Sequence, residues 1–197
     1  MSGPDYHDFA GRIVELFQQI HPLDRVPRAG FLLRGVADPE SVCAHTHFVS
    51  LMALLVLEEY PDKFNRDRVL AMALIHDLAE ARLMDIPMPS ADAYLSESKH
   101  KAEQAIIEDL LEGFPPHLAQ LHDEFSAAET AEARLLRGLD KAQMMIKVLC
   151  YEREHRGNLE EFWHNPKNFR DFGIPVVSTI FDILCTEAGR ERPIAQD

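Results

Sequence analysis

Two long apolar segments that follow each other closely constrain the fold of this chain more than any other feature. They run from Val42 to Tyr60 and from Asn65 to Leu83, and hydrophobic residues lie on nearly all sides of each. A helix that is apolar around most of its circumference is buried at the centre of a domain. The sequence therefore predicts two helices that form a central pair in the core.

Further helices are expected around this pair. The segment Tyr6 to Ile20 repeats hydrophobic residues at three- and four-residue spacing, which is typical of an amphipathic helix. The others are expected over Ser96–Leu111, up to Phe125 after a Pro-Pro pair, from Thr130 to about Arg156, and over Val176–Arg190. No segment shows the apolar and polar alternation of a strand flanked by hairpin turns. We therefore predict an all-α, single-domain helical bundle.

Three irregular segments separate the predicted helices. Residues His21 to Glu40 are rich in proline and glycine, and Ile86-Pro87-Met88-Pro89 forbids a continuous helix. Residues Asn158 to Pro175 are irregular and aromatic, and their Phe and Trp side chains suit either the core or an interface. Because long loops in compact domains are usually functional, the first segment is a candidate functional loop.

Length and composition set the broad class of the protein. The chain has 197 residues, 46% of them hydrophobic, which suits one continuous core and a single domain over residues 1–197. The longest apolar stretches, such as Val49–Leu57 and Val69–Ile75, are shorter than the roughly 20 residues that cross a bilayer. The N-terminal residues also lack the features of a signal peptide. We expect no membrane span and a cytoplasmic protein.

Net charge and cysteine usage exclude two classes of partner and site. The net charge of −13 would repel a nucleic-acid polymer, whereas a small anion can still be bound by a local metal and one or two arginines. Cys43, Cys150 and Cys185 are odd in number and widely spaced, which excludes a disulfide framework and a cysteine-based zinc ribbon. We expect these cysteines to be buried thiols.

A His-Asp pair at the end of an apolar run is the first sign of chemistry. His76 and Asp77 lie in the sequence LAMALIHDLAEARLMDIPMP, with Glu80 four residues after His76. A buried Asp costs several kcal/mol, as an order of magnitude, unless it is paired or binds a cation. At helical spacing Glu80 would share a face with His76. By itself the pair favours a hydrogen-bonded helix C-terminus beside a solvated Glu80, because a His-Asp dipeptide often occurs by chance.

Two further polar residues interrupt apolar stripes. His45 lies on the line of Val42, Val49 and Met52, and Asp140 lies among Leu136, Leu139 and Met144. With His76 and Asp77 they provide four candidate metal ligands from three predicted helices, as a metal site in a bundle core requires. Imidazole with carboxylate suits Mn, Fe, Co, Ni or Zn. His47 competes with His45, and the periodicity alone does not choose between them.

These residues resemble the HD-domain superfamily, whose ordered signature is matched by His45, His76-Asp77 and Asp140. The sequences RVPRAGFLLRGVADPESVCAHT, HDLAEARLMDIPMP and ETAEARLLRGLDKAQMMIKVLCYE are similar to its 5'-deoxynucleotidase branch. The likeness covers about residues 25–156, which leaves 157–197 as a C-terminal helical extension. It implies that His45 and not His47 is a ligand. An acidic residue precedes this histidine in many relatives, where this chain has Ala44.

The resemblance also implies roles around the metal. It assigns Arg34, followed here by Gly35, to the substrate phosphate, and Glu80 and Asp85 to catalysis. In some relatives the residues matching Glu80 and Asp85 hold a second ion with the carbonyl that matches Ile86. We therefore expect the substrate to contact residues from two segments, which are Arg34, Gly35, Asp85, Ile86, Pro87 and Met88. The resemblance further implies a homodimer.

The predicted protein is thus a metal-dependent phosphomonoesterase that acts on nucleoside 5'-monophosphates, with deoxyribonucleotides as the expected substrates. Its cofactor would be a divalent cation, with Mn, Co, Ni, Fe, Zn or Mg as candidates. In this mechanism the ion polarises the phosphate and activates water, and Glu80 or Asp85 handles the proton. Two alternatives stay open, which are an HD phosphohydrolase for triphosphates or an alarmone, and a degenerate HD module used for binding or signalling.

Overall fold

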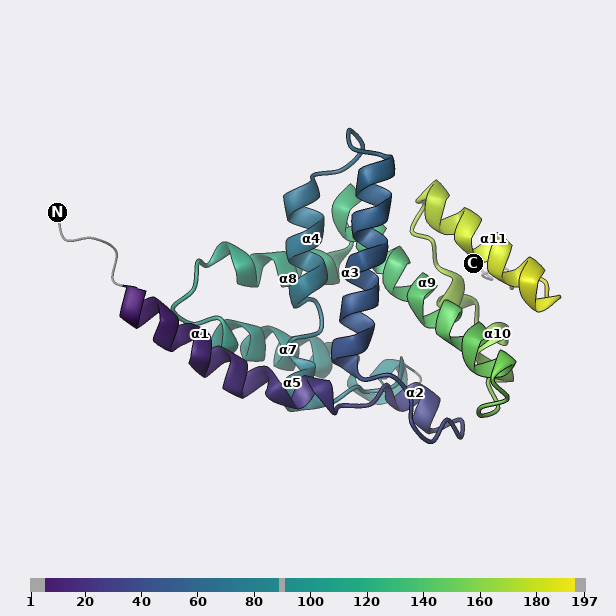
Figure 1. Cartoon of the computed structure of the whole chain (residues 1–197), viewed down its shortest axis with the longest axis horizontal. Coiled ribbons are helices and arrows are strands. Elements are labelled where there is room, and N and C mark those ends of the chain that lie inside the picture. Colours follow the sequence, from purple (N-terminus) through teal and green to yellow (C-terminus); the bar gives the residue numbers. More distant parts are fainter. Residues whose placement is uncertain (1–5, 89–90, 194–197) are drawn as a thin grey trace.

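The computed structural model describes residues 6–88 and 91–193, and helices account for its architecture (Figure 1). The long helices are α1 (Tyr6–Ile20), α3 (Val42–Glu59), α4 (Arg66–Ile75), α7 (Ser96–Leu110), α8 (His117–Ala127), α9 (Ala131–Arg153) and α11 (Pro175–Ala188). Short helical turns are η1 (His21–Asp24), α2 (Ala29–Leu32), α5 (Glu80–Leu83), η2 (Ala91–Leu95), α10 (Glu160–His164) and η3 (Pro166–Phe169). Within the described ranges there is no strand, so the all-α prediction is confirmed.

Helix α9 contacts α3, α4, α8 and α11, and Figure 1 shows it between α3 and α11. Its first turn is fixed by Thr130, whose Oγ1 accepts a hydrogen bond from the Ala133 amide at 3.2 Å. Leu135, Leu136 and Leu139 of this helix are fully buried. Burying a leucine side chain contributes about 1.5–3 kcal/mol, so this row of side chains anchors the bundle.

The predicted central pair is α3 and α4, which pack against each other and against α9. Val49, Val69 and Met72 of this pair are fully buried. The outer side is open, because Leu55 and Leu74 are 61% and 62% exposed. The two helices are therefore core elements on one side only. By length and composition alone α3 would also qualify as a membrane-crossing helix, a criterion that core helices pass as well.

The prediction of one continuous helix over residues 65–83 is wrong. Helix α4 ends at Ile75, residues 76–79 form a turn, and α5 begins at Glu80. In this turn the amide of Leu78 donates to Ile75 O and that of Glu80 donates to Asp77 O, each three residues back. This tighter pattern ends the regular helix and changes the direction in which the residues after Ile75 project.

The cysteine prediction is confirmed only for Cys185, which is buried, whereas Cys43 and Cys150 are exposed. In the aromatic C-terminal segment, Trp163 and Phe169 join the main core, whereas Phe162 and Phe172 line a cavity. The predicted domain over residues 1–197 and the predicted Pro89 loop position include residues 1–5, 89–90 and 194–197, which lie outside the described residues.

Candidate metal centre

The four predicted ligand side chains come together where α3, the end of α4 and α9 meet. His45 lies in the first half of α3, and Asp140 lies near the middle of α9. His76 and Asp77 lie in the turn that follows α4. Adjacent residues of the turn thus supply two of the four side chains, and His76 Nε2 lies 3.2 Å from Asp77 Oδ2.

The distances between these side chains are short. His45 Nε2 lies 3.1 Å from Asp140 Oδ1 and 3.7 Å from Asp77 Oδ2, and His76 Nε2 lies 3.2 Å from Asp77 Oδ2. One ligand atom each of His45, His76 and Asp140 lies within 4.8 Å of the other two. The two imidazole centroids are 5.8 Å apart. Two nitrogens and two carboxylates thus face one small volume.

The donor atoms of this cluster fit a divalent metal. His45 Nε2, His76 Nε2 and Asp77 Oδ2 are buried and make no hydrogen bond to any described residue. Leaving a buried polar atom unsatisfied costs about 1–3 kcal/mol, and more for a charged group. A cation would satisfy all of these atoms at once, and two imidazoles with two carboxylates form a donor set that suits divalent transition metals.

The other ring nitrogen of each histidine is already engaged. His76 Nδ1 lies 2.9 Å from the backbone oxygen of Ala73, and His45 Nδ1 lies 2.6 Å from Gln143 Oε1. Each ring is therefore oriented by an oxygen on one side and keeps Nε2 for the cluster. Histidine ligands in metalloproteins are held in this way.

His47 and His45 are separated clearly by the structure. His45 is fully buried, whereas His47 is exposed and its ring packs against Phe48 with centroids 5.6 Å apart.

Glu80 is only 6% exposed, so the alternative in which Glu80 is a solvated residue beside a helix terminus is wrong.

Burial and nearby positive charges shift the pKa values of Asp77 and Asp140 in opposite directions. Burial alone would raise the pKa of Asp77 and of Asp140. Together, His76, His45 and Arg28 outweigh burial at Asp77. Lys141, His45 and Arg28 outweigh it at Asp140, so both pKa values fall below the ordinary range of Asp. These two carboxyls are therefore held as anions, which is the form that binds a cation.

Glu80 differs from these two aspartates. Burial, together with the negative charges of Asp77 and Asp85, raises its pKa well above the usual range of Glu. Its Oε2 atom is buried and makes no hydrogen bond within the described part of the chain. Glu80 is therefore the carboxyl of this group that most readily accepts a proton.

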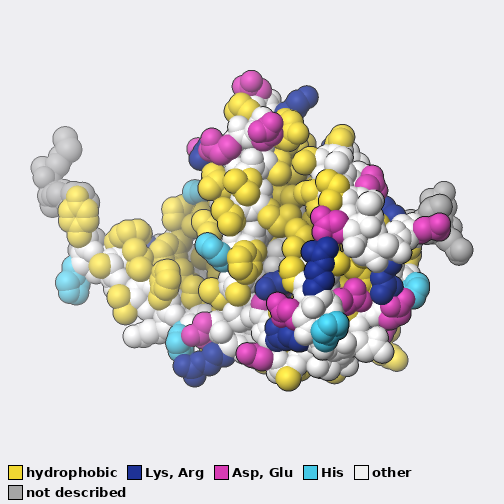
Figure 2. Space-filling model, turned by 45° about the vertical axis from the view of Figure 1, so that its right-hand side comes forward, with side chains coloured by type: hydrophobic (Ala, Val, Ile, Leu, Met, Phe, Trp, Pro, Cys, Tyr) yellow, Lys and Arg dark blue, Asp and Glu magenta, His cyan; other side chains and the backbone are white. Residues whose placement is uncertain are grey.

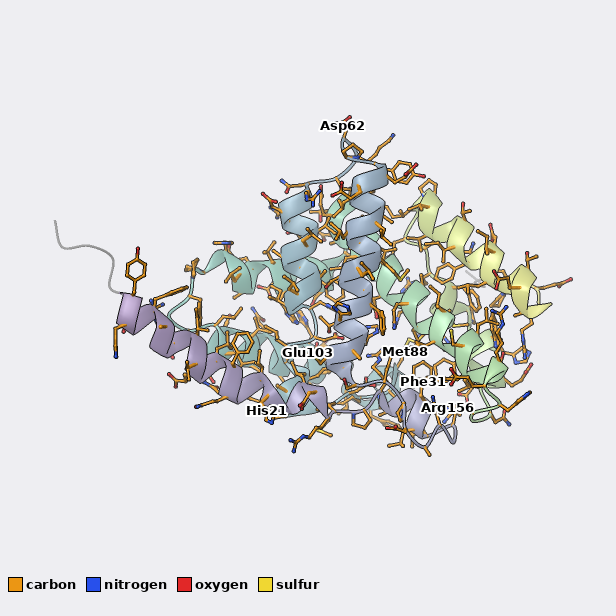
Figure 3. All side chains as sticks on the ribbon, viewed as in Figure 1. His21, Phe31, Asp62, Met88, Glu103 and Arg156 are labelled. Carbon is orange, nitrogen blue, oxygen red and sulfur yellow. The ribbon has the colours of Figure 1, made fainter. Side chains whose placement is uncertain are left out.

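The cluster opens into a cavity of about 610 Å³. Figure 3 labels Phe31, Met88 and Glu103, three lining residues that lie around the lower end of α3 in that view. His76, Asp77, Glu80 and Asp140 also line the cavity. Many of the other lining side chains are aromatic or basic, among them Phe125, Phe162, Phe172, Arg28, Arg34, Lys99, Arg137, Lys141 and Arg170. An acidic centre thus lies beside cationic and aromatic walls, and the volume suits a small-molecule ligand.

Arg34 and Gly35 differ in their placement. Arg34 lines the cavity, but its guanidinium is paired with Glu161, with Nε at 2.8 Å and Nη2 at 2.5 Å from Oε2. Gly35 is not among the cavity-lining residues. It adopts φ 85°, a left-handed conformation that favours glycine, and so turns the chain after Arg34. The geometry therefore gives Gly35 a backbone role.

The segment from Asp85 to Met88 lies along the cavity as the sequence predicts. Asp85, Ile86, Pro87 and Met88 all line it. Asp85 Oδ2 accepts a hydrogen bond from the amide of Ala29 at 2.7 Å, and Oδ1 lies 3.7 Å from Arg28 Nη1. The carboxylate of Asp85 therefore joins this segment to the loop that leads into α2.

Sequence reasoning missed Arg28, whose side chain is 14% exposed in this cavity. Burial alone would lower its pKa, but the charges of Asp85 and Asp77, followed by those of Glu80 and Asp140, raise it. Arg28 is thus the cation that faces the whole carboxylate group. Its only sequence signal is its position in the functional loop, since the partners lie far away in the chain.

Two other lining residues were also missed. His122 of α8 is 2% exposed, and its Nδ1 makes no hydrogen bond to the residues described. Arg137 of α9 lies over the rings of Phe125 and Phe172, 5.1 and 5.8 Å from their centroids. A lone His or Arg on an amphipathic helix gives no sequence signal that separates a cavity residue from a surface residue.

Comparisons with known proteins agree with this geometry. The HD domain family model matches residues 20–171. The 5'-deoxynucleotidase HDDC2 of Xenopus laevis is 34% identical over 159 residues, and the match covers 78% of this chain and 77% of that protein. The Homo sapiens protein of the same name is 32% identical over 160 residues, with 78% and 76% covered. A conserved hypothetical protein from Pyrococcus furiosus, 32% identical, superposes with a TM-score of 0.74 over 89% of this chain and 99% of its own. This chain belongs to the HD-domain family.

Proposed function

We propose that this protein is a metal-dependent 5'-nucleotidase that releases phosphate from deoxyribonucleoside 5'-monophosphates. The observation that carries the proposal is the group of buried, unsatisfied donor atoms at one side of a cavity with basic and aromatic walls. The relatives from Xenopus laevis and Homo sapiens, which are named 5'-deoxynucleotidases, support the choice of substrate.

Membership of the HD-domain family implies a divalent metal, and the donor set fits one. We propose that His45, His76, Asp77 and Asp140 hold it, with Mn, Fe, Co, Ni or Zn preferred over Mg because two ligands are imidazoles. When bound, such an ion polarises a phosphate oxygen and lowers the pKa of water. A second ion at Glu80, Asp85 and the Ile86 carbonyl is less favoured, because Asp85 is engaged by Ala29 and faces Arg28.

The protein residues supply charge and proton transfer. Arg28 and Arg34 line the cavity and would neutralise the phosphate, with Arg28 closer to the carboxylate group. Asp85 holds the loop that carries Arg28 through the Ala29 amide. Glu80 would receive a proton from water at its free Oε2 atom.

The cavity walls suit a nucleotide. Phe125, Phe162 and Phe172 offer ring faces for a base, and the volume of about 610 Å³ lies in the range of small-ligand pockets. Arg137 and Lys141 add cations beyond those that one phosphate needs. This excess favours the alternative of a nucleoside triphosphate or alarmone as the second candidate, so the substrate must be tested across phosphate numbers.

The direct test is phosphate release from ribo- and deoxyribonucleoside mono-, di- and triphosphates. We expect 5'-deoxynucleoside monophosphates to be hydrolysed fastest, with activity lost on chelation by EDTA and restored by added Mn²⁺ or Co²⁺. The control is the matching 3'-monophosphates. Faster hydrolysis of triphosphates would favour the second candidate, and phosphate release that survives complete metal removal would contradict the metal-dependent mechanism.

Substitution of the two arginines should separate their roles. Arg28→Met should lower kcat/KM by about 10²–10³-fold, the scale for losing one charge-stabilising donor. Arg34→Met should lower it less, because Glu161 already engages that guanidinium. Glu161→Gln is the matched control, since it releases Arg34 and should not lower kcat/KM. A variant Arg28→Met with unchanged kinetics would remove Arg28 from the substrate site.

The two accessory carboxylates can be tested in the same assay. Glu80→Gln should lower kcat by about 10²–10⁴-fold, the usual contribution of a general base, while metal affinity changes far less. Asp85→Asn should lower kcat by a smaller factor, because it weakens only the support of Arg28 and Ala29. Parental rates in both variants would leave a metal site without the proposed proton chemistry.

We also propose that the protein is cytoplasmic and that polymeric nucleic acid is not among its partners.

We further propose that the protein is a homodimer. Figure 2 shows hydrophobic side chains gathered along α1 and over α3 and α4. Phe48, Leu51 and Leu55 of α3 are among the exposed large hydrophobic residues. Exposed apolar patches of this kind mark interaction sites.

Sedimentation analysis tests this proposal. The wild-type protein should sediment as a dimer, and Leu55→Glu should sediment as a monomer with the same helical circular dichroism. Glu59→Gln, at the end of the same helix, is a control. A wild-type monomer at micromolar concentration would contradict the dimer.

A further inference from the structure

A buried chain of hydrogen bonds leads from Glu40 through Gln143 to His45. Gln143 Oε1 lies 2.6 Å from His45 Nδ1, and Gln143 Nε2 donates to the two oxygens of Glu40 at 2.9 and 3.2 Å. The exposed fractions of Glu40, Gln143 and His45 are 8%, 2% and 0%. None of the three lines the cavity, so the chain approaches the candidate metal centre from within the protein.

Glu40 fixes which groups donate and which accept along this chain of hydrogen bonds. An ionised carboxylate only accepts hydrogen bonds, so the NH₂ group of Gln143 must face Glu40 and the amide oxygen must face His45. An oxygen at that position accepts a hydrogen bond, so His45 Nδ1 must carry the proton and donate it. In a neutral imidazole the other nitrogen is then unprotonated, which leaves the lone pair of Nε2 for a metal.

Glu40 lies 3.8 Å from His45 Nδ1 and is also held by two residues that are not candidate ligands. Its backbone amide donates to the hydroxyl of Tyr151 at 2.8 Å, and Lys147 Nζ lies 3.5 Å from Glu40 Oε2. Tyr151, Lys147 and Gln143 all belong to α9, the helix that also carries Asp140. The same helix therefore presents one candidate ligand directly and orients another through Gln143.

We propose that Glu40 and Gln143 are positioning residues of the metal centre, which select the Nδ1-protonated form of His45 and aim its Nε2 atom at the ion. The proposal rests on the metal site of the proposed function. A merely structural role, in which the chain only satisfies buried polar groups between α9 and the residues before α3, would predict normal metal binding whenever the fold is intact.

Metal affinity of the apoprotein distinguishes these two roles. Glu40→Gln keeps the size of the side chain but removes the charge that fixes the amide of Gln143, and Gln143→Met removes the acceptor for His45. Each variant should bind Zn²⁺ about 10- to 100-fold more weakly in a titration against a competing chelator, the usual effect of losing a partner of a metal ligand. The double variant should be no weaker than Gln143→Met alone, because the two residues act in series.

Tyr151→Phe is the matched control for these variants. It removes the hydroxyl that accepts the Glu40 amide but leaves the Glu40 carboxylate, Gln143 and His45 in place. Its affinity for Zn²⁺ should equal that of the wild type. Circular dichroism of all the variants confirms that the helical content is kept.

The protonation of His45 Nδ1 in the metal-free wild type is a second readout. Long-range ¹H–¹⁵N correlation spectra at pH 8 should show a proton on Nδ1 of His45, with His45→Gln used to assign the signal. Glu40→Gln should give a mixture of the two tautomers. A neutral His45 protonated at Nε2 in the wild type overturns the proposal, even where the variants do not fold.

The outcomes also separate this proposal from the proposed function. If the wild type binds no Zn²⁺, or binds it equally well as His45→Gln, the metal site itself is wrong. If the wild type binds Zn²⁺ through His45 and the folded variant Glu40→Gln binds it with equal affinity, only the positioning role is wrong.

Discussion

Two imidazole nitrogens and two aspartate carboxylates face one another inside this protein, and several of their atoms have no hydrogen-bond partner among the described residues. Desolvating such groups is unfavourable unless an opposite charge compensates them. Arg28 and Lys141 provide part of that charge from the cavity side, and a divalent cation would provide the rest. A bound cation would therefore stabilise the place where α3, the end of α4 and α9 meet.

The helices contribute different residues to the candidate metal centre. α9 is the central element of the core, and it contributes Asp140 directly and Gln143 beside His45. α4 ends at Ile75, and the turn after it carries His76 and Asp77. The sequence of the segment between η1 and α3 shows no helix or strand pattern. This segment places Arg28 Nη1 3.7 Å from Asp85 Oδ1. A rigid helical core thus positions the candidate ligands, whereas loops supply the charges that would meet a substrate.

Much of the fold follows from the sequence because helical periodicity is a local signal. The bounds of α1 and the starts of α3 and α7 agree with the hydrophobic pattern. The end of α4 was missed, because apolar residues continue past Ile75 and the turn is made by hydrogen bonds that no residue type announces. The exposure of Cys43 and Cys150 was missed for a similar reason, since burial of a small apolar residue depends on which helix face meets a neighbour.

For the site, too, the sequence indicates residues that stand out among their neighbours in the chain, but not residues whose partners are distant in the sequence. Four candidate ligands could be selected from charge in apolar surroundings. The periodicity did not separate His45 from His47, the resemblance to the HD-domain superfamily favoured His45, and packing places His45 in the core and His47 on the surface. Arg28 could not be selected, because its partners are brought to it only by the fold. In the sequence, Glu40 and Gln143 look like ordinary polar residues. Only the distances from Gln143 to His45 and to Glu40 show that the three are joined by hydrogen bonds.

The central claim is that one divalent ion is bound by His45, His76, Asp77 and Asp140, and a crystal structure of the protein grown with Zn²⁺ tests it most directly. Anomalous scattering at the zinc edge should show one strong peak, with His45 Nε2, His76 Nε2 and an oxygen of each aspartate at about 2.0–2.2 Å. Zinc bound instead through His47, or no zinc peak between α3, α4 and α9 at saturating metal, would contradict the account.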